Sequence, residues 1–189
     1  MAATLAGKRV AILATDGVEE VELTEPRRAV TEAGADVDLV SVSGGEIQAM
    51  KSDITPTNRY QVDQVASDAR AEDYDALIMP GGTVNADRLR MNADVRRFVQ
   101  DFFHAGKPVG VICHGPWTLV EADLVRGRTL TSYPSLRTDI RNAGGTVVDE
   151  EVVTDHGLVS SRSPRDLPAF CAKIIEEFAE GVHPEGATA

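Results

Sequence analysis

The chain has 189 residues, 42% hydrophobic and 26% charged, which is typical of one soluble globular domain with a substantial core. A formal net charge of −11 argues against binding nucleic acid or anionic membranes, because both need clustered Lys and Arg. No apolar run approaches the ~20 residues of a membrane span, and residues 1–8 lack a signal-peptide pattern. Cys113 and Cys171 do not form a disulfide framework, so we expect a cytoplasmic protein with reduced thiols.

The first half of the chain alternates short apolar runs with helix-like segments. Residues 8–14 are typical of a strand that is buried on both faces of a sheet. Farther along, Pro26 suits the first position of a helix that Gly34 ends. The expected elements are strands at 8–14, 36–42, 75–79 and 109–112, helices at 19–23, 27–33 and 94–104, and a small hairpin at 44–57.

The second half continues the alternation, which predicts an α/β domain over 1–189 with a parallel sheet and helices on both faces. Its expected elements are helices at 117–122, 135–142 and 167–180, strands at 146–149, 152–154 and 158–160, a segment at 128–131, and a loose tail at 181–189. Ligand sites in such sheets lie beyond the carboxyl ends of the strands. We therefore expect the loops at 15–22, 80–82 and 113–115 to converge on one crevice.

The strongest chemical signal is the sequence Val-Ile-Cys-His-Gly-Pro at 111–116. An apolar run stops at Cys113 and a helix follows, as in the elbow of strand–nucleophile–helix hydrolases. The helix N-terminus would favour the thiolate. His114 is a candidate base, although pairing of adjacent side chains requires a strained backbone, and its N–H is a candidate oxyanion donor. The alternatives are a small apolar core cysteine and a histidine that contributes only its backbone.

Two neighbouring loops carry further candidates. Gly81 and Gly82 follow a core strand, and the N–H of Gly82 is a candidate second oxyanion donor, although glycine pairs also form ordinary turns. Of the acidic residues Glu19, Glu20 and Glu22, we expect one to point at the thiol, with its pKa raised by burial and by a neighbouring thiolate. Such a protonated carboxyl could donate to the sulfur. The alternative is solvated surface charge.

Two more residues have weaker signals. Asp87 has the position of an acid at the start of a helix, and Tyr133 could either hydrogen-bond an intermediate or pack as an ordinary tyrosine. No spacing of His, Cys or carboxylate residues suggests a metal site, and no cofactor is expected.

Together these motifs resemble the PfpI family of the DJ-1/PfpI superfamily over almost the whole chain. The resemblance rests on residues 16–23 with Pro26, 79–82, 106–108, 112–116, 131–134 and 142–162. It implies a flavodoxin-like, doubly wound, mostly parallel sheet with a nucleophile-elbow cysteine.

The resemblance also implies roles for individual residues. Cys113 corresponds to the nucleophile, His114 to its partner, Glu22 to the acid that hydrogen-bonds the sulfur, and Tyr133 to a tyrosine near the active site. Asp87 matches the position where family peptidases place a glutamate that reaches the histidine of a neighbouring subunit. A homodimer or higher homo-oligomer is therefore implied.

The leading hypothesis is a stress-protective cysteine-dependent enzyme. It would be an intracellular peptidase, or a hydrolase or lyase that acts on methylglyoxal or glycated adducts, so its substrates would be peptides or small carbonyl compounds. A second hypothesis is a redox sensor or holdase whose Cys113 is oxidised to sulfenic and sulfinic acid. A third, a binding domain with a degenerate site, is disfavoured by the intact motif at 113–116.

Overall fold

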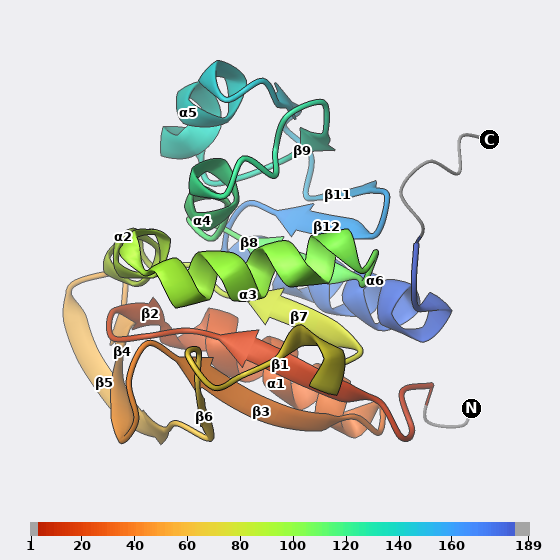
Figure 1. Ribbon diagram of the computed structural model, residues 1–189. Coiled ribbons are helices and arrows are strands. Elements are labelled where there is room, and N and C mark those ends of the chain that lie inside the picture. Colours follow the sequence, from red (N-terminus) through yellow and green to blue (C-terminus); the bar gives the residue numbers. More distant parts are fainter. Residues whose placement is uncertain (1–3, 184–189) are drawn as a thin grey trace.

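A computed structural model describes residues 4–183, which fold around one seven-stranded sheet (Figure 1). All neighbouring strands pair in parallel except the edge strand β11, which is antiparallel to β12, so the predicted mostly parallel sheet is confirmed. The strand order is β11 (Val152–Asp155), β12 (Leu158–Ser161), β8 (Val109–Ile112), β7 (Ala76–Met79), β1 (Arg9–Leu13), β3 (Asp36–Ser41) and β6 (Gln64–Val65).

Helices cover both faces of this sheet, as Figure 1 shows. Successive residues of β7 illustrate the two layers, because Leu77 and Met79 pack in one apolar cluster whereas Ala76 and Ile78 pack in the other. The first cluster includes side chains of α2 (Thr83–Met91), α3 (Ala93–His104), α4 (Pro116–Glu121) and α5 (Arg137–Asn142). The second includes side chains of α1 (Glu20–Glu32) and α6 (Leu167–Glu180).

Smaller elements flank the main sheet. The predicted hairpin is present and extends to residue 61. It forms a three-stranded sheet from β2 (Val18–Glu19), β4 (Glu46–Lys51) and β5 (Thr55–Gln61). A second small sheet pairs β9 (Thr129–Leu130) with β10 (Thr146–Val147). Three short 3₁₀ turns, η1 (Ala71–Asp73), η2 (Pro134–Leu136) and η3 (Pro164–Asp166), complete the described elements.

The first helix differs from the prediction, because 19–23 and 27–33 form one helix, α1, with Pro26 inside it. Pro26 lacks only the N–H that would bond the carbonyl of Glu22. Its ring is buried in line with Leu23 and Val30, at helical spacing. The packing of this apolar stripe therefore outweighs the loss of one hydrogen bond.

The helix α2 was not predicted, and Asp87 lies within it rather than at its start. Only Asn85, Ala86 and Leu89 are buried in α2, so its sequence lacks an apolar helical period. Its first turn is capped by the Asp53 carboxylate, which accepts a hydrogen bond from the Thr83 N–H at 2.7 Å. The start of the helix is thus set by a residue thirty positions earlier in the chain.

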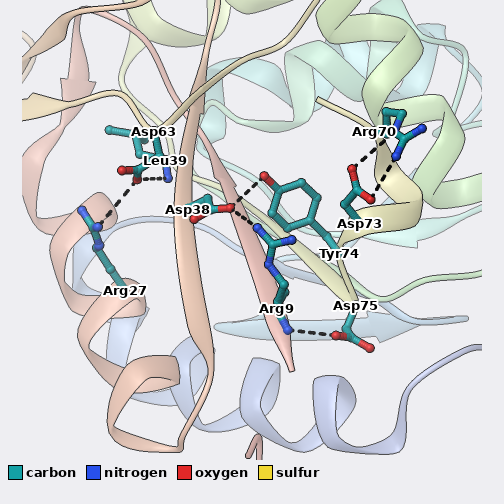
Figure 2. A network of polar contacts seen from close by, with 9 residues as sticks. All are labelled: Arg9, Arg27, Asp38, Leu39, Asp63, Arg70, Asp73, Tyr74 and Asp75. Carbon is teal, nitrogen blue, oxygen red and sulfur yellow. Dashed lines mark hydrogen bonds and ion pairs between the residues drawn. The ribbon is translucent and has the colours of Figure 1, made fainter. Parts of the chain in front are cut away.

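A polar network joins the strands near their amino ends (Figure 2). Asp38 accepts hydrogen bonds from Arg9 Nη2 at 2.7 Å and from the Tyr74 hydroxyl at 3.0 Å, and Asp75 accepts one from the Arg9 N–H at 2.8 Å. Burial and the adjacent Asp38 raise the pKa of Tyr74. The network ties β1, β3 and the entry to β7 together on the side away from the predicted site.

Among the helices of residues 4–183, none has the length and apolar character needed to cross a membrane.

We predict that Gly110→Ala destabilises the fold by about 1–3 kcal/mol, because an added methyl group overpacks the core. A Cβ at Gly110 would lie 2.7 Å from Ile174 Cγ2 and 3.2 Å from Phe170 Cζ of α6. Urea unfolding measures the effect. Gly44→Ala is the matched control, since its nearest neighbour would be 3.8 Å away at Val65. Equal free energies of unfolding for the two variants would contradict this packing argument.

Candidate active site

The three loops predicted to converge do meet at Gly81. The Gly81 N–H donates to Glu22 Oε2 at 2.7 Å, and the Gly81 carbonyl accepts from the Glu19 N–H at 3.3 Å. A Cβ on Gly81 would lie 2.6 Å from Cys113 Cβ, so this position admits only hydrogen. The predicted convergence of 15–22, 80–82 and 113–115 is therefore confirmed.

Cys113 occupies a strained turn between β8 and α4. Its φ is +61°, in the left-handed region that non-glycine residues rarely adopt. Its N–H donates to the Ser161 carbonyl at 3.1 Å, which ties the turn to the neighbouring strand β12. Only 6% of the residue is exposed, so the thiol does not project into an open crevice as the sequence suggested.

The strained turn brings the adjacent His114 ring back to the sulfur. Nδ1 of His114 lies 3.2 Å from Cys113 Sγ, and the ring stacks on Tyr133 with centroids 4.5 Å apart. On its other side, Nε2 lies 3.3 Å from both Thr83 Oγ1 and Ser135 Oγ. Burial lowers the pKa of His114, which favours the neutral imidazole that can accept a proton.

Glu22 is the member of the acidic run that points inward. It is fully buried, and burial raises its pKa to about 8. Interactions of the ionised carboxylate with the Gly81 N–H and with Cys113 oppose this rise only in part. Its second oxygen, Oε1, has no hydrogen-bond partner within 4–183 by distance and angle. The expected inward-pointing acid is therefore Glu22, and its raised pKa favours the protonated carboxyl, whereas Glu19 and Glu20 bind the hairpin.

Burial raises the pKa of Cys113 and so favours the thiol, whereas the sequence predicted that the helix N-terminus would favour the thiolate. Glu22 raises the pKa of Cys113 further at pH values where its carboxyl is ionised. The N–H groups of Gly82 and His114 point at the sulfur and lower the pKa by a smaller amount. Desolvation prevails because α4 has only six residues and the thiol is nearly closed off from water.

The two remaining predicted residues, Tyr133 and Asp87, lie in different surroundings. Tyr133 covers the His114 ring and is 40% exposed, so it lies at the mouth of the site. Asp87 is exposed on α2, and its side chain forms no hydrogen bond or ion pair with residues 4–183. The fold of a single chain therefore does not bring Asp87 to His114.

Sequence reasoning missed several residues that hold the site together. Thr83 and Ser135 contact His114 Nε2, and Asp53 binds Thr83. Asn85 is fully buried, accepts from the Thr15 N–H at 2.7 Å and donates to the Gly81 carbonyl at 3.0 Å, so it joins two of the loops. None of these residues belongs to a recognisable sequence motif. The only signal in the sequence is position, because Thr83 and Asn85 follow a core strand and Asp53 lies in the predicted hairpin.

Two surface hollows flank the site. One of about 570 Å³ has Tyr133 at its rim together with Arg137, Arg162 and Arg165. The other, of about 400 Å³, reaches Asp53 at the hairpin tip. Neither of these two hollows includes Cys113 among its lining residues.

One other cluster has the composition of a metal site. Ligand atoms of Glu177, Glu180 and His183 lie within 4.8 Å of one another at the end of α6. Glu177 already pairs with Lys173 at 3.2 Å and with His183 at 3.4 Å. Glu177 is therefore already engaged by Lys173 and is not free to bind a metal ion.

Comparison with known proteins agrees with the resemblance seen in the sequence. The family model described as the DJ-1/PfpI family matches residues 8–177. The Bacillus subtilis protein YraA, whose name proposes a cysteine protease, is 40% identical over 163 residues, which cover 86% of this chain and 94% of that protein. Escherichia coli protein/nucleic acid deglycase 2 is 39% identical over 165 residues, 86% of this chain and 93% of that protein. Drosophila melanogaster DJ-1beta has a TM-score of 0.81 with 28% identity, over 91% of this chain and 90% of that structure.

We predict that Glu22→Gln flattens the pH dependence of stability. With its pKa raised to about 8, Glu22 keeps its proton in the folded protein up to about that pH, whereas the unfolded chain releases it near the ordinary glutamate pKa of 4.5. Raising the pH between these values therefore favours unfolding, with a slope of up to about 1.4 kcal/mol per pH unit from this group. Urea unfolding at pH 5, 6, 7 and 8 measures the slope.

The control for this experiment is Glu25→Gln, because Glu25 is a partly exposed residue of α1 that pairs with Arg28. It should keep the wild-type slope. If Glu22→Gln and wild type lose stability in parallel as the pH rises, Glu22 is not protonated in the folded protein.

Proposed function

The chain belongs to the DJ-1/PfpI family, and from that premise we propose that it is a stress-protective cysteine-dependent enzyme acting on small carbonyl compounds, such as methylglyoxal, or on their adducts. The observation that carries the proposal is the 3.2 Å contact between Cys113 Sγ and His114 Nδ1. A neutral imidazole at that distance is within reach of the thiol proton. The name of the deglycase relative supports the same class of substrate.

The proposed first step adds the Cys113 thiol to a carbonyl carbon. The thiol proton passes to His114 Nδ1 as the S–C bond forms, and the carbonyl π electrons move onto oxygen. That oxygen then takes the proton from the imidazolium, so the product is a neutral thiohemiacetal. The N–H groups of Gly82 and His114 are the candidate donors to the developing oxyanion, and each such donor is worth roughly 10²–10³ in rate.

Glu22 complements this step because it is protonated below about pH 8. A neutral carboxyl adds no second negative charge beside the sulfur when the thiolate forms. Its unpartnered Oε1 is available to carry the proton and to donate toward the sulfur. A buried neutral acid thus lowers the free energy needed to form the thiolate. No cationic side chain is needed for this effect.

The limited exposure of the site favours a small substrate over a peptide. Cys113 and His114 are each only 6% exposed, whereas cleavage of a peptide requires an extended segment to lie across the sulfur. The same burial and the raised pKa of Cys113 disfavour rapid oxidation, so they support the enzyme over the redox sensor. The peptidase and the redox sensor are the alternatives that experiment must separate.

We also propose that the active protein is at least a dimer, formed through the outer face of α2. Asp87 has no partner within the described chain and lies three residues after Val84 and four before Met91, which are 43% and 74% exposed. These three side chains share one side of the helix. An unpartnered acid between exposed apolar residues is suited to a second copy, where Asp87 could approach the partner's site.

We predict that Cys113→Ala abolishes turnover of methylglyoxal, of a glycated thiol and of a fluorogenic peptide, measured side by side. Wild type should turn over the carbonyl substrates and not the peptide. Cys171→Ala is the matched control and should keep wild-type rates, since Cys171 lies on α6, away from the converging loops. Turnover by Cys113→Ala would refute the enzyme, and peptide cleavage by wild type would favour the peptidase.

For the dimer, we predict a light-scattering mass of at least twice the 20.2 kDa of one chain, and about 20.2 kDa for Met91→Glu. A charge placed at the centre of an apolar contact opposes association. Val182→Glu provides the control, because Val182 is 59% exposed beyond the end of α6. A monomeric wild type at micromolar concentration would rule out the proposed assembly.

A further inference from the structure

The hydroxyl of Thr83 links His114 to a carboxylate at the tip of the β4–β5 hairpin. Thr83 Oγ1 lies 3.3 Å from His114 Nε2 and donates to Asp53 Oδ2 at 2.8 Å. The Thr83 N–H donates to Asp53 Oδ1 at 2.7 Å. Both oxygens of the Asp53 carboxylate therefore bind the same residue, which fixes the carboxylate relative to the histidine.

The direction of these hydrogen bonds decides where the histidine carries its proton. A carboxylate only accepts hydrogen bonds, so the single hydroxyl hydrogen of Thr83 points at Asp53. Thr83 Oγ1 therefore offers a lone pair to His114 Nε2, and the Ser135 hydroxyl, also 3.3 Å from Nε2, can accept from the same N–H, so this arrangement favours the ring hydrogen on Nε2. Nδ1 is left with its lone pair directed at Cys113 Sγ, 3.2 Å away. This is the tautomer that a base for the thiol needs.

We propose that Asp53 is a positioning residue that acts through Thr83 to hold His114 in the Nε2–H tautomer, ready to accept the Cys113 proton. The inference rests on the proposed role of His114 as the base. It assigns to a residue of the same chain the orienting role that the family resemblance gives to Asp87 of a neighbouring subunit. Asp53 touches neither the sulfur nor the reacting carbon.

The hairpin tip is held in place for this contact. Ser52 and Asp53 have φ values of +55° and +63°, so the tip adopts a strained turn. The Glu19 carboxylate accepts from the Ser52 N–H at 3.1 Å and from the Asp53 N–H at 3.4 Å. Glu19, from the first loop, thus fixes the tip, which accounts for a second member of the acidic run.

When the imidazole takes up the thiol proton, the Asp53 carboxylate is the nearby negative charge that stabilises the cation. Its charge raises the pKa of His114 and so opposes the effect of burial. A carboxylate connected through one hydroxyl can therefore both select the tautomer and support the protonated ring. A simpler role, capping the first turn of α2, is served by the Thr83 N–H alone, and the two roles can be separated by mutation.

The test compares Asp53→Asn, Thr83→Val and Thr83→Ser by ¹⁵N NMR of the His114 ring, assigned with His114→Gln. In Asp53→Asn the new amide donates to Thr83 Oγ1 and turns the hydroxyl hydrogen toward Nε2, so the ring hydrogen should move to Nδ1. Thr83→Val keeps the backbone cap and removes the hydroxyl, so the tautomer preference should weaken. Thr83→Ser keeps the hydroxyl and should restore the wild-type spectrum.

The kinetic expectation follows the same pattern. Asp53→Asn should lower kcat for methylglyoxal roughly 10²-fold or more with little change in KM, because the wrong tautomer cannot take the thiol proton. Thr83→Val should also lower kcat, and Thr83→Ser should recover most of it. Asp68→Asn, at an exposed aspartate between β6 and η1, is the control for loss of an acidic charge.

Unchanged His114 spectra in Asp53→Asn and Thr83→Val, with the variants folded by circular dichroism, would overturn the inference. So would equal losses of kcat in Thr83→Val and Thr83→Ser. If Asp53→Asn unfolds, the Val and Ser variants at position 83 still decide, because both keep the cap. The NMR readout does not depend on turnover, so an inactive wild type would refute the proposed function without touching this result.

Discussion

The close approach of three backbone segments at Gly81 is the constraint on which the site depends. A side chain at this position would collide with the Glu22 carboxyl and with Cys113, so the two functional groups can approach only across a glycine. The Gly81 N–H then fixes one oxygen of Glu22, and its carbonyl fixes the loop that carries Glu19. These backbone contacts bring Glu22, Cys113 and the hairpin together at the candidate active site.

Burial, rather than a nearby positive charge, determines the pKa values in the candidate active site. It raises the pKa values of Glu22 and Cys113 and lowers that of His114, so burial favours the neutral form of each group. A neutral set is stable in a dry site, since each separate ion would lose its hydration. Proton transfer between Cys113 and His114 is then the event that creates charge, close to the N–H groups that can stabilise it.

His114 is held from three directions by residues from three parts of the chain, around positions 83, 113 and 133–135. Cys113 precedes it, Tyr133 stacks on its ring, and Thr83 and Ser135 face Nε2. Thr83 begins α2 and depends on Asp53 of the hairpin. The geometry of the ring is therefore coupled to the hairpin and to α2, which are also the elements nearest the proposed subunit contact.

The sequence by itself determined the parallel sheet, the strand–turn–helix position of Cys113 and the inward acid. Apolar runs, glycine turns and the motif at 111–116 are local patterns, and local patterns reflect backbone preference and burial directly. The tertiary structure decided the neutral state of the thiol, the single helix through Pro26, the existence of α2, and the roles open to Asp53 and Thr83. Each of these depends on desolvation or on hydrogen bonds between residues far apart in the chain, and such contacts exist only after the layers pack.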